Sequence, residues 1–265
     1  MGPVGGTERC IRAKEAAMRH SVRQLAARAR WAAKERCRAL SFLLSPNRVS
    51  WRREWESCSS AEDLFSFASS HIGIGQNRVE FLRFLAYIEG ERPANVLEIG
   101  VRDGGTSFMF ANALKTSRHV LGVDVRLRNI HLLRAYCPTW IVRQEFVCGE
   151  SARPSTVSEV RRRLGSAKLD LLFIDGDHSY RGAEADFEAY RQLVRDGGLI
   201  AFHDICMDHR RRYGAETPND SGEVYRLWQR LRGSYETKEF FEDEKQNGAG
   251  IGTITWDPSR SVDLG

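Results

Sequence analysis

The sequence predicts an α/β domain of the Rossmann-like class, with a mostly parallel sheet of seven strands and a helical segment in front of it. From about residue 93, short apolar stretches alternate with helical stretches, which is typical of a parallel sheet covered by helices. The last two strand-like stretches flank Gln246-Asn247-Gly248, a turn sequence that favours an antiparallel pair. With 265 residues the chain is long enough for one large domain and an extension.

The N-terminal 77 residues are predicted to form a helical extension, and residues 78–265 the main domain. Residues 8–44 are rich in Ala, Arg and Glu and contain no Pro or Gly, which favours a helix. Ser45-Pro46-Asn47 is expected to end that helix. Short helices that cap the domain are expected in residues 50–70, and a helix in residues 79–88 precedes the first strand.

The net charge of +5 is unevenly distributed along the chain. Residues 1–60 hold 13 Lys/Arg and 5 Asp/Glu, whereas the remaining residues hold 27 and 30. The basic character therefore belongs to the extension. We expect the extension to pack on the domain or on a second copy of the chain, which would make a homo-oligomer. A targeting presequence and a nucleic-acid or membrane-surface arm are the alternatives.

The composition favours a cytoplasmic protein. No run of 18 or more apolar residues is present, so no membrane-spanning helix is expected. The N-terminus lacks the apolar stretch of a secretory signal. None of the six cysteines lies in a CxxC pair, and in a chain of this length they are expected to be reduced thiols.

Strands and helices are expected to alternate along the main domain. The expected strands are residues 95–99, 119–125, 145–148, 169–175, 199–203, 235–241 and 250–256. The expected helices between them are residues 106–115, 129–136, 156–164, 182–194 and 223–231. The helix at 182–194 is expected to be closed by Asp196-Gly197-Gly198. The domain is thus expected to have five strand–helix units followed by a hairpin. A plain dinucleotide-binding sheet would not end in that hairpin.

The turn after the first strand has the composition of a nucleoside-binding loop. Glycines allow a ligand to approach the backbone, and the following helix offers free N–H groups. The dinucleotide fingerprint GxGxxG is not met, because Arg102 stands where its second glycine belongs. Glu98, two residues before Gly100, would also repel a pyrophosphate. S-adenosylmethionine (SAM) has no phosphate and carries a sulfonium and an ammonium group, so an acid at this turn suits it.

Two further positions complete the expected cofactor site. Asp124 ends the second strand, where an acid binds ribose hydroxyls in α/β folds, although it could instead cap the next helix. Glu150 and Ser151 follow the third strand, where the adenine edge is expected. The full expected set is Glu98, Gly100, Arg102, Gly104, Gly105, Thr106, Ser107, Asp124, Val125, Glu150, Ser151 and Asp175.

Acids and histidines follow the fourth and fifth strands. Asp175, Asp177 and His178 follow residues 169–174, and His203 and Asp204 end the next strand. Because adjacent parallel strands end at one edge of the sheet, Asp175, His203 and Asp204 are expected to converge. This donor set suits Mg²⁺, Mn²⁺ or Fe²⁺, which would lower the pKa of a substrate hydroxyl.

His178 is the expected general base, since an imidazole titrates near neutral pH. Each residue also has a plainer interpretation. Asp175 could contact only the cofactor, Asp177 could cap the following helix, and His203 could be a buried structural imidazole.

These stretches resemble a known family. The segments from Phe173 to Gly182 and from Asp196 to Asp204 are similar to class I methyltransferases of the macrocin O-methyltransferase and cephalosporin hydroxylase-type group. The segments from Gly222 to Trp228 and from Gly248 to Trp256 fit the closing helix and last strand of that group. The resemblance implies a sheet in the order 3-2-1-4-5-7-6 with bound SAM.

The resemblance also implies a reaction. Many relatives hold Mg²⁺ through an acid after strand four and two adjacent residues after strand five, and Asp175, His203 and Asp204 match these positions. The relatives usually carry an acid or amide where His203 stands. Their substrates are commonly hydroxyls of sugars or natural products, so O-methylation of a small molecule is expected. Arg210, Arg211 and Arg212 lie in the expected substrate loop, residues 205–221.

Three other functions are considered. A nicotinamide-dependent oxidoreductase is disfavoured by the missing glycine and by the terminal hairpin. An RNA methyltransferase would use residues 8–53 as a basic arm, but no NPPY-type motif for a flipped base is present. A non-catalytic protein could also retain the fold, because a fold does not guarantee activity.

Overall fold

A computed structural model describes residues 29–138, 141–260 and 262. The chain divides into two compact units, residues 1–48 and 49–265. In the first unit residues 29–43 are helical, and Arg38 Nη1 donates to Glu35 Oε1 at 3.0 Å. This confirms the C-terminal part of the helix expected over residues 8–44. Its first part, residues 8–28, lies outside the described residues.

The second unit begins earlier than the boundary at residue 78 that the sequence suggested. Its N-terminal elements are α2 (Asn47–Ser57), α3 (Ala61–Phe67) and the π-helical turn η1 (Ala68–Ile72). Phe67 is buried and stacks on Phe108, with ring centroids 5.6 Å apart. Trp55 Nε1 donates to Asn112 Oδ1 at 3.0 Å. These side chains belong to the core of the domain, so the helices cap it as expected for residues 50–70.

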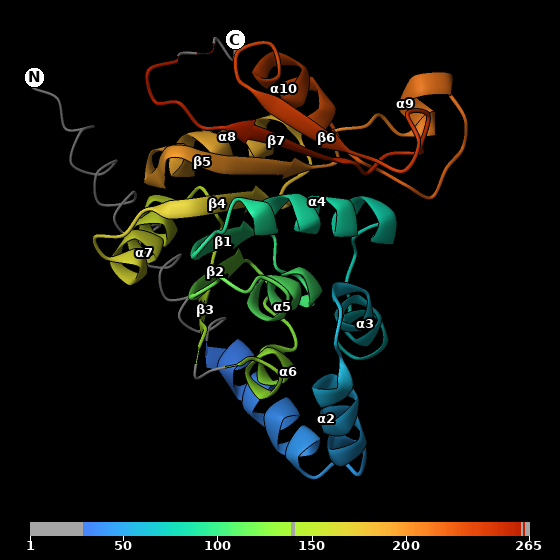
Figure 1. Ribbon diagram of the computed structural model, residues 1–265, viewed down its shortest axis with the longest axis vertical. Helices are drawn as coiled ribbons and strands as arrows, with labels where there is room; N and C mark the ends of the chain where they lie inside the picture. Colours follow the sequence, from blue (N-terminus) through green and yellow to red (C-terminus); the bar gives the residue numbers. More distant parts are fainter. Residues whose placement is uncertain (1–28, 139–140, 261, 263–265) are drawn as a thin grey trace, which may run out of the picture. The chain divides into compact units, whose positions relative to one another are not determined.

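The sheet has seven strands in the order β3-β2-β1-β4-β5-β7-β6, which confirms the expected fold class (Figure 1). Its first five strands pair in parallel, and β7 lies antiparallel between β5 and β6. The strands are β1 (Asn95–Ile99), β2 (His119–Asp124), β3 (Arg143–Cys148), β4 (Leu169–Ile174), β5 (Val194–His203), β6 (Thr237–Phe240) and β7 (Ile251–Thr255).

Helices cover both faces of the sheet, and β4 shows how its side chains are divided between them. Leu172 and Ile174 pack with apolar side chains of α7, α8 and α10, whereas Phe173 contacts Phe84 of α4 and Phe110 of α5. This is the two-residue alternation of a strand buried on both faces. The helices are α4 (Arg78–Gly90), α5 (Gly105–Asn112), α6 (Ile130–Ala135), α7 (Pro154–Leu164), α8 (Tyr180–Tyr190), the 3-10 turn η2 (Arg191–Leu193), α9 (His209–Tyr213) and α10 (Val224–Leu231).

The start of β5 differs from the prediction. The sequence placed a helix cap at Asp196-Gly197-Gly198 and began the strand at residue 199, but β5 already begins at Val194. The pairing of β4 with β5 is irregular between Leu169 and Leu171, and Gly197 adopts a φ of +67°. Its N–H donates to Trp256 O at 2.9 Å. The glycine pair therefore accommodates an irregularity inside the strand.

The connection between β6 and β7 is longer than the predicted tight turn. The antiparallel pairing is confirmed, but residues 241–250 form a ten-residue loop between the two strands. Gly248, Ala249 and Gly250 all have positive φ values. These backbone conformations turn the end of the loop toward the carboxyl edge of the sheet, where it meets α4.

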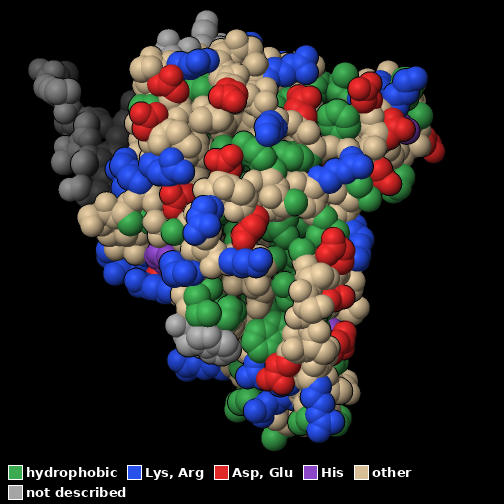
Figure 2. Space-filling view, viewed as in Figure 1, with side chains coloured by type: hydrophobic (Ala, Val, Ile, Leu, Met, Phe, Trp, Pro, Cys, Tyr) green, Lys and Arg blue, Asp and Glu red, His purple; other side chains and the backbone are tan. Residues whose placement is uncertain are grey.

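Charged side chains of both signs share the surface. On the face in Figure 2, Lys and Arg side chains are interspersed with Asp and Glu. This agrees with the near balance of charge after residue 60. Among the described residues, no helix combines the length and apolar character needed to span a membrane.

Candidate active site

A cavity of about 900 Å³ opens at the carboxyl edge of the sheet. It is lined by the turn after β1, the ends of β2 and β4, and the loop after β3. The expected site residues that line it are Gly100, Arg102, Gly105, Thr106, Asp124, Val125, Glu150, Ser151, Asp175, His178 and His203. Glu98, Gly104, Ser107 and Asp204 are not among the lining residues. The cavity is large enough for a nucleoside and a small second ligand.

Gly100 allows the turn after β1 to lie against the end of β4. It adopts a φ of +94°, and a Cβ at this position would lie 1.9 Å from the carbonyl oxygen of Asp175. Its N–H donates to Val123 O at 2.9 Å. No other residue type satisfies both the φ value and the contact, so the backbone at the floor of the cavity stays bare.

Glu98 lies below the floor of the cavity. It is 1% exposed and accepts a hydrogen bond from the Ser107 hydroxyl of α5. Burial, with smaller contributions from the nearby Asp175 and Asp124, raises the pKa of Glu98 to about 8 against the opposing effect of the Ser107 hydrogen bond. The side chain is therefore mostly a neutral acid at pH 7, and Ile99 and Gly100 line the cavity instead.

Asp124 stands at the end of β2 and fixes two loops. Its Oδ2 accepts from Arg102 N at 2.7 Å, and its Oδ1 accepts from Arg126 N at 2.6 Å. The next helix, α6, begins only at Ile130 and has Asn129 as its N-cap, so Asp124 closes the turn after β2 and does not cap that helix. Its carboxylate also lines the cavity.

Two contributors to the cavity were not identified from the sequence. The loop Gly73-Ile74-Gly75-Gln76 is not part of the expected site, yet it lines the cavity, and Gln76 Nε2 donates to Asp175 Oδ2 at 2.7 Å. Asp186 of α8 also lines it. Asp186 is 1% exposed, and burial raises the pKa of its carboxyl to about 6. Neither position belongs to a local motif, so only packing brings it to the site.

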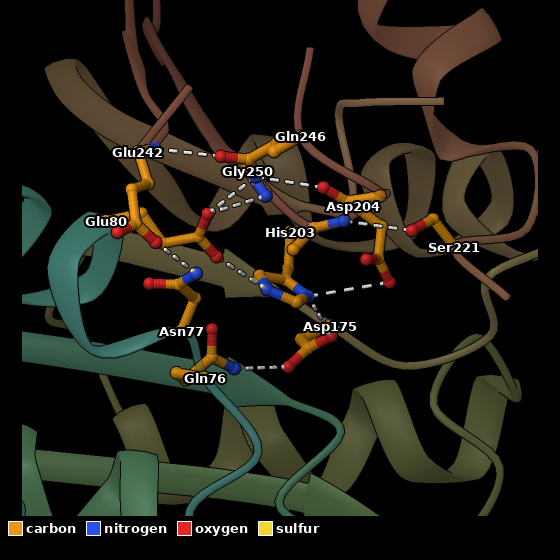
Figure 3. Close-up of polar contacts among 12 residues, drawn as sticks. Gln76, Asn77, Glu80, Asp175, His203, Asp204, Ser221, Glu242, Gln246 and Gly250 are labelled. Atoms are coloured by element: carbon orange, nitrogen blue, oxygen red, sulfur yellow. Dashed lines mark hydrogen bonds and ion pairs between the residues drawn. The ribbon is translucent and has the colours of Figure 1, made fainter. Parts of the chain in front are cut away.

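The acids and histidines converge as the sequence predicted. His203 Nδ1 lies 3.2 Å from Asp175 Oδ1 and 3.5 Å from Asp204 Oδ2 (Figure 3). His178 Nδ1 lies 2.8 Å from Asp204 Oδ2, and its Nε2 lies 3.5 Å from Asp175 Oδ1. Asp175, His178 and Asp204 each offer one ligand atom within 4.8 Å of the others. His178 therefore lies about as close to the two carboxylates as His203 does.

The two carboxylates of this cluster attract positive charge. Hydrogen bonds to Asp175 and Asp204 raise the pKa of His178 to about 10, against the opposing effect of burial. Burial lowers the pKa of His203, but the same two acids outweigh it and raise that pKa well above its usual range. The pKa values of both acids are lowered in turn by the histidines, despite burial. His178 is thus protonated at neutral pH unless another cation neutralises the acids.

Neighbouring polar residues have structural partners. Asp177 Oδ1 accepts from Ser179 N at 2.9 Å, but the N-cap of α8 is Ser179, whose hydroxyl accepts from Gly182 N at 3.0 Å, so Asp177 does not cap the helix as one interpretation expected. In the loop after β5, Arg211 Nη1 lies 2.8 Å from Asp220 Oδ1 and also pairs with Asp208. Arg210, Arg211 and Arg212 do not line the main cavity. This arrangement agrees with a solvated charged loop.

Comparison with known proteins fits this geometry. Residues 97–205 match the family model described as a methyltransferase domain, and this segment contains β1 to β5 with both acid-bearing strand ends. The chain therefore has the seven-stranded fold of class I methyltransferases, and the matched residues are similar to a methyltransferase domain. This agrees with the family resemblance that the sequence motifs indicated.

Solved structures share the methyltransferase fold at low sequence identity. An O-methyltransferase from Bacillus cereus in complex with S-adenosylhomocysteine (SAH) is 17% identical, with a TM-score of 0.52 over 76% of this chain and 92% of that one. MycE of the mycinamycin biosynthetic pathway, in complex with Mg, SAH and mycinamycin VI, is also 17% identical. Its TM-score is 0.50, over 75% of this chain and 54% of MycE.

Curated relatives match only short parts. An uncharacterized protein of Acanthamoeba polyphaga mimivirus is 48% identical over 42 residues, which is 16% of this chain. An uncharacterized protein of Sinorhizobium fredii is 25% identical over 120 residues, or 43% of this chain. The matches span 19% and 13% of the lengths of those two proteins.

Proposed function

We propose that this protein is a SAM-dependent methyltransferase, which transfers the methyl group of SAM to a hydroxyl of a small molecule with the help of a divalent cation. The observation that carries the proposal is the shared cavity. The bare glycine turn and Asp124 line one part of it, and the acid–histidine cluster of Asp175, His178 and His203 lines another. A donor and an acceptor bound there would lie side by side.

The donor site is assigned to the turn after β1 and the strand ends beside it. Gly100, Gly105 and Thr106 would face the methionine part of SAM, since their backbone lines the cavity at the start of α5. Asp124 would accept hydrogen bonds from the ribose hydroxyls. Val125, Glu150 and Ser151, with Arg102 at the rim, would surround the adenine and ribose.

The cluster fits a divalent cation. Asp175 and Asp204 offer carboxylate oxygens, and His203 Nδ1 lies 3.2 Å from Asp175 Oδ1 and 3.5 Å from Asp204 Oδ2. Both nitrogens of His203 are buried and make no hydrogen bond to the described residues. Nδ1 faces Asp175 and Asp204, so it could bind a cation together with them. A mixed oxygen and nitrogen donor set suits Mg²⁺ or Mn²⁺. Such an ion, when bound, would lower the pKa of an acceptor hydroxyl.

His178 is the proposed proton acceptor. Its side chain is 40% exposed, in contrast to the buried His203, and it lines the cavity. In the reaction the hydroxyl proton passes to an imidazole nitrogen, the oxygen forms a bond to the methyl carbon, and the carbon–sulfur bond breaks to leave SAH. His178 can serve as the base only when a cation offsets the charge of Asp175 and Asp204.

The MycE complex supports a small hydroxyl-bearing acceptor and a metal by analogy of fold alone, because that structure holds Mg, SAH and mycinamycin VI. Homo-oligomerisation through the N-terminal helices and a cytoplasmic location remain predictions from the sequence. The RNA alternative also remains a prediction, because residues 8–28 of its proposed basic arm lie outside the described residues.

The test combines binding with transfer. SAM and SAH are titrated into the protein by calorimetry, and methyl transfer from labelled SAM is measured on a panel of sugar and phenolic hydroxyl acceptors, with Mg²⁺ or with EDTA. We expect SAH binding in both conditions and transfer only with the metal. If the protein binds neither SAM nor SAH, the methyltransferase assignment is wrong. Equal transfer with EDTA would remove the metal from the proposal.

A further inference from the structure

We infer that Glu80 is a positioning residue that fixes the imidazole of His203 so that its Nδ1 faces Asp175 and Asp204. Glu80 lies on α4, before the first strand of the sheet, and outside every motif of the site. The inference rests on the proposed cation site, and it assigns a residue that orients one of the cation's ligands without touching the cation. Glu80 itself does not line the cavity.

Glu80 is a buried carboxylate, and one of its oxygens lies beside His203. Its residue exposure is 0%. Its Oε2 accepts from Gln246 Nε2 at 2.9 Å and from Gly250 N at 3.0 Å. Its Oε1 accepts no hydrogen bond from the described residues and lies 3.4 Å from His203 Nε2. Because a buried carboxylate is costly unless it is paired, the free oxygen beside the imidazole indicates a role there.

The His203 ring is held between acids on opposite sides. Its Nε2 faces Glu80, and its Nδ1 faces Asp175 and Asp204 (Figure 3). When Nε2–H donates to Glu80, the lone pair of Nδ1 points toward the two site carboxylates. This is the arrangement in which a carboxylate orients a metal-binding histidine through its second nitrogen and fixes its tautomer. The same contact also fixes the plane of the ring.

The loop between β6 and β7 holds Glu80 in place. Glu242 N donates to Gln246 Oε1 at 2.8 Å, which orients the amide that binds Glu80. Asn77 Nδ2 at the start of α4 donates to Glu242 Oε2 at 3.3 Å (Figure 3). Several hydrogen bonds thus join the loop to α4 and its N-cap. These contacts fix the position of the Glu80 carboxylate, so that it can hold the imidazole of His203 in one orientation.

The experiment measures metal affinity on the full-length protein. Mn²⁺ is titrated by calorimetry, in the presence of SAH, into wild type, Glu80→Gln and the control Glu91→Gln. Glu91 is an exposed acid at the end of the same helix. Loss of such a supporting group weakens metal binding about 10- to 100-fold, so we expect that change in Glu80→Gln alone. The SAH affinity and the melting temperature without metal are expected to stay close to wild type.

Several outcomes would overturn the inference. Mn²⁺ affinity in Glu80→Gln within twofold of wild type would show that the acid only ties down the loop. A wild type that binds SAH but no Mn²⁺ would remove the site that Glu80 is said to support, while the methyltransferase assignment would stand. Failure to bind SAH would instead count against the proposed function.

A second measurement covers the case in which Glu80→Gln does not fold. Nitrogen-15 NMR of the His203 ring in the wild-type protein with Mg²⁺ reports which ring nitrogen carries the proton. We expect a protonated Nε2 and an unprotonated Nδ1. A proton on Nδ1 in the Mg²⁺-loaded protein would contradict the proposed orientation, whatever the variant does.

Discussion

Replacing Glu98 by Gln is expected to weaken the dependence of the protein's stability on pH. Glu98 is buried beneath the turn after β1, and burial raises its pKa from 4.5 to about 8. Between these values the unfolded side chain has lost its proton, whereas the folded side chain retains it. Unfolding therefore releases a proton, and the free energy of unfolding falls as the pH rises. The stability is fully present below pH 4.5 and is lost as the pH passes through about 8.

The size of the effect follows from the pKa difference. Each pH unit in this window lowers the free energy of unfolding by about 1.4 kcal/mol, so the full window amounts to about 5 kcal/mol. A glutamine at position 98 carries no charge at any of these pH values, and its amide oxygen can still accept from Ser107. The stability of Glu98→Gln relative to wild type is therefore expected to increase steadily from pH 5 to pH 8.

The assay is urea unfolding followed by tryptophan fluorescence at pH 5, 6, 7 and 8, without ligand. Trp228 and Trp256 are buried in the core and report its unfolding. Glu184→Gln, a substitution at a partly exposed position on α8, is the control. Its free energy of unfolding should change with pH in the same way as that of wild type. A difference between Glu98→Gln and wild type that stays constant across the four pH values would refute the assignment of Glu98 as a buried neutral acid.

Three substitutions test the site and the core. Asp124→Ala removes a charged hydrogen-bond acceptor and should weaken SAH binding by about 1.5–3 kcal/mol, or roughly 10- to 150-fold by calorimetry; unchanged affinity would separate Asp124 from the ribose. Gly252→Ala places a Cβ 2.5 Å from Trp228 Cζ2 and should lower stability by about 1–3 kcal/mol in urea. A neutral result there would show that the indole can move aside. Phe84→Ala, at a fully buried ring, should cost about 3–5 kcal/mol, and a loss below 1 kcal/mol would contradict the packing of α4 on the sheet.

The methyltransferase sheet could be predicted because its signals are local. Residues 95–99 and 169–174 are short apolar stretches bounded by turn residues, and both are strands at or within one residue of the expected bounds. The convergence of Asp175, His203 and Asp204 followed from one rule, that adjacent parallel strands end at one edge. Where the pattern was ambiguous, as at Asp196-Gly197-Gly198, the sequence could not distinguish a helix cap from an irregular strand. Pairing with β4 and β7 decided that case.

The sequence by itself therefore determined the succession of strands and helices, the turn after β1 and the acids at the strand ends, because each depends on neighbours along the chain. The strand order was implied by the family resemblance. Only the tertiary structure decided that Gln76 contacts Asp175, that Glu98 lies below the cavity rather than in it, and that Glu80 faces His203. Glu80 and Gly250, which bond to each other, are 170 residues apart. Such contacts depend on how α4 and the β6–β7 loop pack against the finished sheet, and no spacing along the chain encodes that packing.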